Sequence, residues 1–311
     1  MKNNSKYPAD IFVSLQDLLR MEHIASGFSF LAKKQKVRSI LGGKHASKLR
    51  GRGLDFEEVR NYVAGDDIRN IDWKVTARTQ KTHTKVFSEE KEKPALIVVD
   101  QSKSMFFGSQ KKMKSVVAAE LAALAAFRIL KEGDRVGGVV FADDGIDIVF
   151  PKRDRKNIVR FLEKIVTRNR ELATSIPLDF QASLKEVFAK IRNIVTHDFL
   201  VIIIGDFHRY SPEVVKSIIQ ISQHNDVILS KVYDLMERTI PSTSLIAGDG
   251  EKQLVIDGRN KQITANFEKG FDQDFAEFSA QMKKHRIPII LTDTVTNVEE
   301  QLKETLKGRK K

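Results

Sequence analysis

The segment best suited to chemistry is an apolar run, residues 95–99, that ends at Asp100 and is followed by Ser102 and Ser104. A run of this length and composition is typical of a buried strand in a parallel sheet. Open α/β sheets bind ligands just past the carboxyl ends of their strands, which is where these side chains fall. One carboxylate and two hydroxyls are hard oxygen ligands that suit Mg²⁺, or alternatively Mn²⁺ or Ca²⁺. The same residues also suit an ordinary turn, because Asp and Ser favour turns.

A second acid occupies an equivalent place further along the chain. The apolar run 199–204 is followed by Gly205 and Asp206. The carboxyl ends of parallel strands meet at one edge of a sheet. The sequence therefore predicts that Asp100 and Asp206 reach the same crevice.

The elements that must hold these residues alternate between strands and helices over residues 94–234. A helix is predicted over 111–131 from apolar residues at helical spacing, ending before Gly133, which suits a C-terminal cap. Strands are predicted over 136–141 and 146–150. This alternation predicts an α/β fold with a doubly wound, mostly parallel sheet.

Two parts flank this central domain. Residues 1–93 are predicted to form an N-terminal extension, with a helix near 13–23 and a dense polar block. Residues 235–311 are predicted to complete the same domain as a small α+β portion with a hairpin, helices and a basic tail. The hairpin is expected because the apolar runs 244–246 and 254–256 flank an Asp-Gly turn signal.

The overall composition narrows the functional class. The 311-residue chain has no cysteine, which removes disulfides, thiol nucleophiles and Cys-based metal sites from consideration. No stretch approaches the roughly 18 apolar residues of a membrane span. The N-terminus lacks the apolar core of a signal peptide, so we expect a cytoplasmic protein.

The net charge of +12 lies outside the central domain. Residues 20–54 hold nine Lys/Arg and one Glu, and residues 301–311 hold five Lys/Arg and one Glu. Such extensions can bind nucleic acid or make peripheral contact with anionic membrane lipid, which is our alternative function. No aromatic residues interleave the tail as base stacking requires, so nucleic acid is not the expected partner.

A polar block over residues 53–78 interleaves charges with aromatic residues and holds the single tryptophan, Trp73. Forked ion pairs to the aspartates Asp55, Asp66, Asp67 and Asp72 are expected from Arg60, Arg69 and Arg78. We interpret the block as a salt-bridged clasp that packs its aromatic residues against the sheet domain, with Arg69 as a stabilising residue. A catalytic acid cluster is the other interpretation, but arginine neighbours lower carboxylate pKa values, whereas a general acid needs a raised one.

This block carries a family resemblance. The most specific string is Gly65-Asp66-Asp67-x-Arg69-x-Ile71-Asp72-Trp73, with Arg60, Tyr62 and Ala77-Arg78 around it. It resembles the bacterial domain-of-unknown-function family fifty-eight, and the resemblance covers most of the chain after residue 30. Members of that family look like von Willebrand factor A-like proteins. They occur beside AAA+ ATPases of the MoxR class and are thought to act with them in assembling or activating other complexes.

The resemblance implies a metal-ion-dependent adhesion site, whose pattern is D-x-S-x-S. The residues that carry over as metal ligands are Asp100, Ser102, Ser104 and, as the acid of the third loop, Asp206. Related domains place a threonine in the second loop, where this chain offers Thr174, with Ser175 as the alternative. The serines would contact magnesium directly and the aspartates mostly through water, leaving an open position for a carboxylate of a partner.

Motifs of the common enzyme classes are missing from the sequence. Residues 42–45 (Gly-Gly-Lys-His) lack the upstream glycine and the hydroxyl of a phosphate loop, and no G-x-S-x-G elbow surrounds Ser102 or Ser104. The missing motifs favour a non-enzymatic protein, and the family resemblance implies a metal-dependent protein-interaction module that is a partner of a MoxR-type AAA+ ATPase. A metallophosphatase is a minor alternative, because one metal ion with one or two acids supports phosphoester hydrolysis.

Overall fold

A computed structural model describes residues 7–26, 54–89, 93–174, 180–248 and 253–307 of the chain. The chain divides into two compact units, one of residues 36–92 and one of all the others. Helix α1 (Leu15–Ser26), which lies in the predicted N-terminal extension, belongs to the larger unit and packs on α4 (Lys114–Lys131).

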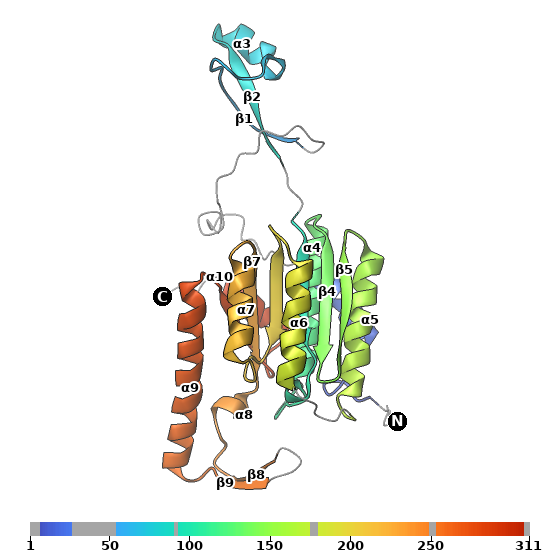
Figure 1. Ribbon diagram of the computed structural model, residues 1–311, viewed down its shortest axis with the longest axis vertical. Helices are drawn as coiled ribbons and strands as arrows, with labels where there is room; N and C mark the ends of the chain where they lie inside the picture. Colours follow the sequence, from blue (N-terminus) through green and yellow to red (C-terminus); the bar gives the residue numbers. More distant parts are fainter. Residues whose placement is uncertain (1–6, 27–53, 90–92, 175–179, 249–252, 308–311) are drawn as a thin grey trace. The chain divides into compact units, whose positions relative to one another are not determined.

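The larger unit is built on a six-stranded sheet (Figure 1). Its strands are β3 (Ala95–Asp100), β4 (Val136–Ala142), β5 (Gly145–Lys152), β6 (Leu200–Gly205), β7 (Asp226–Tyr233) and β10 (Ile289–Asp293). The spatial order is β10-β7-β6-β3-β4-β5, and every pair is parallel except β4 with β5. The predicted doubly wound, mostly parallel sheet is therefore confirmed.

The centre of this sheet is its topological switch point. The chain runs outward from β3 to β4 on one side, and β6 pairs with the other side of β3. Crevices at such points, outside the carboxyl ends of the strands, are where open α/β sheets bind ligands. All six residues of β3 are buried, as expected for a central strand covered on both faces.

Helices cover both faces of the sheet (Figure 1). One core cluster joins α1, α4, α5 (Arg155–Glu171) and α10 (Val298–Lys307) to alternate residues of β3. The other joins α6 (Phe180–Ile194), α7 (Pro212–Ser222) and the end of α9 (Lys261–Lys284) to the intervening residues. Gly133, just after α4, has a φ of 96°, which confirms its predicted role as a cap. Among the helices in the described ranges, none is both long enough and apolar enough to cross a bilayer.

The predicted hairpin is also present. Strands β8 (Ser244–Gly248) and β9 (Gln253–Asp257) pair antiparallel, while the turn between them lies outside the described residues. A short helix, α8 (Leu235–Arg238), joins β7 to the hairpin, and α9 follows it. The side chains of Ile246, Leu254 and Val255 are exposed, so this hairpin presents apolar surface.

The smaller unit contains the polar block. Strands β1 (Leu54–Asn61) and β2 (His83–Glu89) pair antiparallel, and a 3₁₀ turn (Ile68–Asn70) and helix α3 (Trp73–Thr79) lie between them in the chain. Most of the basic stretch 20–54 and the end of the C-terminal tail lie outside the described residues.

One of the ion pairs expected in this block is confirmed. Arg60 makes a forked pair to Asp66 at 2.8 and 2.7 Å, and Asp72 caps α3 while lying 3.6 Å from the ammonium group of Lys85. The side chain of Arg69 is exposed, which removes the basis for expecting a large stability cost from its loss. Trp73 is 69% exposed, so it is not a core residue of this unit.

Candidate functional site

Asp100 and Asp206 lie at the carboxyl ends of the neighbouring strands β3 and β6, as the sequence predicted. Both are buried. A glycine allows the close approach of the two strand ends, because a Cβ atom on Gly205 would lie 3.1 Å from the Cβ atom of Asp100. The switch point of the sheet thus brings two carboxyl groups together away from water.

The Asp100 loop turns back on its own strand. Asp100 Oδ1 accepts the backbone N–H of Ser102 at 2.8 Å, and the hydroxyls of Ser102 and Ser104 lie 3.2 Å apart. A 3₁₀ turn (Lys103–Met105) follows, anchored by the fully buried side chain of Met105. The spacing D-x-S-x-S therefore places one carboxylate and two hydroxyls on one tight loop.

The second oxygen of Asp100 has no partner. Oδ2 is the one buried carboxylate oxygen without a hydrogen bond among the residues that the structure describes. Burial, followed by the nearby charge of Asp206, raises the pKa of Asp100 to about 7, although hydrogen bonds from Ser102 act in the opposite direction. Among the described residues, no hydrogen bond therefore compensates a negative charge on Oδ2 of Asp100.

Asp206, in contrast, is fully engaged. Its Oδ1 accepts the backbone N–H of His208 at 3.1 Å, which the left-handed backbone of Phe207 (φ 55°) makes possible. Its Oδ2 accepts from the ammonium group of Lys114 at 3.0 Å. Burial acts to raise the pKa of Asp206, but Lys114 and further hydrogen bonds, including one from Ser104, outweigh it and hold that pKa below its usual value.

Each of the five parallel strands ends in or is followed by an aspartate. These residues are Asp100, Asp143, Asp206, Asp234 and Asp293. The last two are capping residues: Asp234 caps α8 by accepting the N–H of Met236 and also accepts from Ser109 and Thr294, and Asp293 accepts two backbone N–H groups of the following turn. Position after a strand thus gives several candidate metal ligands. The hydrogen bonds distinguish them, because Asp234 and Asp293 are occupied by structural contacts whereas one oxygen of Asp100 is not.

Two site residues were not singled out from the sequence. Asp143, buried after β4, accepts the backbone N–H of Lys103 at 2.6 Å and so braces the candidate metal loop. Its place directly after an apolar strand was the signal that could have found it. The buried hydroxyl of Tyr210 has no hydrogen-bond partner among the described residues, and burial together with the charges of Asp100 and Asp206 raises its pKa.

The second loop is the least complete part of the site. Thr174 is exposed, and its hydroxyl donates to the carbonyl of Glu171 at 3.2 Å. The loop is nevertheless tied to the metal loop, because Lys103 Nζ donates to the carbonyl of Leu172 at 2.8 Å. Ser175, the alternative ligand, lies outside the described residues.

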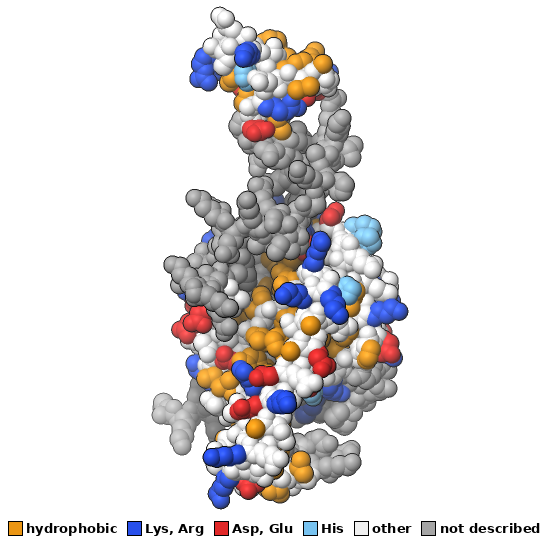
Figure 2. Space-filling view, turned by 90° about the vertical axis from the view of Figure 1, so that its left-hand side faces the viewer, with side chains coloured by type: hydrophobic (Ala, Val, Ile, Leu, Met, Phe, Trp, Pro, Cys, Tyr) orange, Lys and Arg blue, Asp and Glu red, His pale blue; other side chains and the backbone are white. Residues whose placement is uncertain are grey.

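A groove of about 650 Å³ opens beside Asp206. Its apolar wall is formed by the phenylalanines Phe207, Phe267, Phe271, Phe275 and Phe278, four of them from α9, and its polar side includes Asp206, Lys231 and Glu237. Figure 2 looks onto the side of the molecule where α9 lies and shows apolar side chains gathered there. The candidate metal loops therefore border an aromatic surface.

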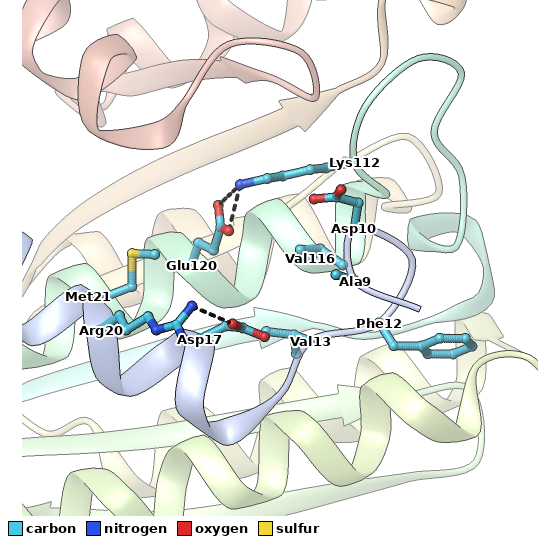
Figure 3. Close-up of a pocket in the computed structure, with 10 residues that line it drawn as sticks. All are labelled: Ala9, Asp10, Phe12, Val13, Asp17, Arg20, Met21, Lys112, Val116 and Glu120. Carbon is cyan, nitrogen blue, oxygen red and sulfur yellow. Dashed lines mark hydrogen bonds and ion pairs between the residues drawn. The ribbon is translucent and has the colours of Figure 1, made fainter. Parts of the chain in front are cut away.

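A smaller pocket of about 230 Å³ lies between α1 and α4 (Figure 3). Lys112 points across it to Glu120, with its ammonium group 2.6 and 2.9 Å from the two carboxylate oxygens. None of the candidate ligands lines this pocket, so we treat the Lys112–Glu120 pair as a structural contact.

Residues 58–277 match the sequence family described as "Protein of unknown function DUF58", which is well over half of the chain. The chain belongs to this family. The family resemblance predicted from the polar block is confirmed by this match.

Curated relatives of this DUF58 protein include uncharacterized proteins of Mycobacterium bovis and Mycobacterium tuberculosis. Each is 29% identical over 177 residues, which are 57% of this chain and 54% of the relative. The DUF58 chain therefore spans about half the length of the curated relatives that it matches.

Two solved structures are similar to the DUF58 chain. The conserved hypothetical protein BatB from Bacteroides thetaiotaomicron has a TM-score of 0.42 at 15% identity, covering 68% of this chain and 98% of BatB. A von Willebrand factor type A protein from Catenulispora acidiphila has a TM-score of 0.26 at 15% identity, covering 49% and 35% of the two chains.

The donor set of the DUF58 chain fits a small divalent cation. Oδ2 of Asp100 is a buried acceptor without a partner, and the hydroxyls of Ser102 and Ser104 adjoin it in the same loop. Within the described ranges, no three carboxylate or imidazole groups are grouped to hold a metal, so the serines are essential to this ligand set. Mg²⁺ prefers a coordination shell in which a few protein oxygen atoms bind the ion and water molecules fill the remaining positions.

Proposed function

We propose that this protein is a metal-dependent protein-interaction module. The observation that carries the proposal is the unpartnered, buried Oδ2 of Asp100 beside the hydroxyls of Ser102 and Ser104, at the switch point of the sheet. A cation there would be held by these three side chains. Asp206 would contribute through water, because Lys114 and His208 already occupy its two oxygens.

The chemistry that a bound Mg²⁺ supplies is an open coordination position for a carboxylate of a partner protein. The chain's own residues set the geometry of that position. Asp143 holds the backbone of Lys103, and the side chain of Lys103 reaches the second loop at Leu172, so both loops are braced. Thr174 or Ser175 is proposed to complete the set from that second loop.

The aromatic groove supports a protein as the ligand. Phenylalanine side chains, some of them partly exposed, offer apolar contact area next to the proposed metal position. Aromatic residues at the centre of an interface contribute much of its binding energy. A phosphoester substrate would gain little from such a wall, so the groove favours protein binding over the metallophosphatase alternative.

The partner that we propose is an AAA+ ATPase of the MoxR class, and the role is to help it assemble or activate other proteins. This part of the proposal rests on the resemblance described for the family. We propose that the interaction takes place in the cytoplasm, where ATP is available to such an ATPase. The alternative function is binding of nucleic acid or anionic lipid by residues 20–54 and the basic tail. That binding would weaken steeply as the salt concentration rises.

The test measures the affinity of the full chain for a MoxR-class ATPase from the same genome, by calorimetry at fixed salt. Wild type in Mg²⁺ is compared with Ser102→Ala/Ser104→Ala and with Ser217→Ala, a matched control whose hydroxyl only bonds its own helix. We expect the double variant and chelator to abolish binding, Mg²⁺ to restore only the chelated wild type, and the control to bind normally.

Equal binding by wild type and the double variant, with no effect of chelator, would exclude the metal bridge. A steep fall in affinity with rising salt would then identify the basic segments as the binding surface.

A further inference from the structure

The second acid of the site is held by a buried lysine. Lys114 Nζ lies 3.0 Å from Asp206 Oδ2 and 2.5 Å from Glu237 Oε1, and the side chain is 2% exposed. Glu237 belongs to the capping box of α8, so this one ammonium group joins the loops that follow β6 and β7. A cation supplied by the chain therefore already lies beside a candidate metal ligand.

Lys114 remains charged in this position. Burial acts against its charge, but the carboxylates of Asp206 and Glu237 outweigh that effect and raise the pKa of Lys114. A second lysine supports the same loop, since Lys231 donates to the backbone carbonyl of Asp206. Burial lowers the pKa of Lys231, so Lys114 is the main positive charge that the chain supplies on this side of the site.

We propose that Lys114 is a built-in counter-ion that lowers the affinity of the site for divalent cations by keeping Asp206 in an ion pair. The inference rests on the proposed function, since it concerns the same metal site. Asp100 would be left as the single negative ligand of the ion. Metal binding would then be weak until a partner adds its own carboxylate.

The distances give the physical reason. Lys114 donates to Asp206 at 3.0 Å, and Asp206 follows the strand that pairs with the strand of Asp100, so an ion held by the Asp100 loop would lie near the ammonium group. Two cations so close repel each other in a buried site, where charge interactions are only weakly screened. The ion and the ammonium group also compete for the same carboxylate.

The test is the Mg²⁺ affinity of the full chain, measured by calorimetry, together with the rise in thermal midpoint that Mg²⁺ causes. Lys114→Met keeps the length of the side chain and removes its charge. We expect this variant to bind Mg²⁺ at least about tenfold more tightly than wild type, the size of effect that a neighbouring charge has on proton affinity. Its thermal midpoint should be low in chelator and rise more with Mg²⁺ than that of wild type.

Lys112→Met is the matched control. Lys112 is also paired with a buried acid, Glu120, but the pocket that these two residues line contains none of the candidate ligands. This variant should lose stability without changing Mg²⁺ affinity by more than about twofold. If Lys114→Met does not fold in chelator, Lys114→Met/Glu237→Gln removes one of the two acids left unpaired and is measured in its place.

The outcomes separate this inference from the proposed function. Unchanged or weaker Mg²⁺ binding by the Lys114 variant, with wild type binding measurably, overturns the inference and leaves the metal site standing. Binding by the variant but not by free wild type supports the inference, and the metal-dependent function is then overturned only if Mg²⁺ also has no effect on wild type in the presence of the ATPase partner. Binding by neither overturns the inference, and it overturns the function as well if Mg²⁺ has no effect with the partner present.

Discussion

The side chain of Asn169 donates a 3.0 Å hydrogen bond to the side chain of Gln101, inside the candidate metal loop, and both residues are fully buried. Asn169 also accepts the backbone N–H of Val13 at 2.9 Å, and Gln101 donates to the carbonyl of Ser115. A buried chain of hydrogen bonds thus connects the N-terminal segment, α5, the metal loop and the start of α4.

Asn169→Ala is expected to lower the free energy of unfolding of the sheet unit by about 1–3 kcal/mol, because it leaves a buried N–H and a buried carbonyl unpaired. Urea unfolding followed by far-UV circular dichroism measures this, since the single tryptophan lies in the other unit. Asn193→Ala, at an exposed asparagine of α6, is the control. Equal stability of the two variants would contradict the structural role of Asn169.

Asp100 should make the metal-free protein more stable in acid than near neutrality. Its pKa is 3.8 as a free side chain and about 7 in the folded chain, so the folded state binds the proton more tightly. The resulting stabilisation is complete below about pH 4 and is lost as the pH rises toward 7, at no more than about 1.4 kcal/mol per pH unit. Asp206 acts in the opposite direction, because its lowered pKa gives stability that is lost as the pH falls below its usual value of 3.8, which lies outside this window.

The free energy of unfolding is measured for wild type and for Asp100→Asn between pH 4 and 7 in chelator. Taking the difference between the two proteins cancels the contributions of the other titrating groups. The difference should fall with rising pH, and saturating Mg²⁺ should reduce the fall because a bound cation favours the ionised carboxylate. Parallel pH profiles for the two proteins would show that Asp100 does not titrate in this range.

Phe267→Ser should weaken binding of the ATPase partner at least about tenfold while leaving the thermal midpoint close to that of wild type. Phe267 lines the aromatic groove and is 39% exposed, so its loss removes contact area for a partner rather than core packing. Ile263→Ser changes a similarly exposed apolar residue of α9 that does not line the groove. Equal affinity of the two variants would exclude the groove from the interface.

In the smaller unit, Arg60→Ala should lower stability more than Arg69→Ala. Both arginines are exposed, but Arg60 makes two hydrogen bonds to Asp66 and one to the carbonyl of Asn61, whereas the side chain of Arg69 makes none to the described residues. The fluorescence of Trp73 follows unfolding of this unit selectively, because it is the only tryptophan of the chain. A larger shift in the urea midpoint for Arg69→Ala would restore the stabilising role first expected of that residue.

The sequence by itself determined the elements of the fold and the edge where the chemistry lies. Apolar runs such as 95–99 and 199–204 form buried strands because burial of a continuous apolar segment depends on local composition. Asp100 and Asp206 follow these runs, so their meeting at one edge followed from the parallel arrangement. The hairpin and the cap at Gly133 were likewise predictable, because each depends on a few neighbouring residues that favour a particular backbone conformation.

Only the tertiary structure decided which of these aspartates is left without a partner. Five acids end parallel strands, and nothing in the spacing distinguishes Asp100 from the capping residues Asp234 and Asp293. The distinction arises because Lys114, which is distant from Asp206 in the chain, reaches that acid and not Asp100. Hydrogen bonds and ion pairs depend on which loops meet in space, and hydrophobic periodicity does not encode that information.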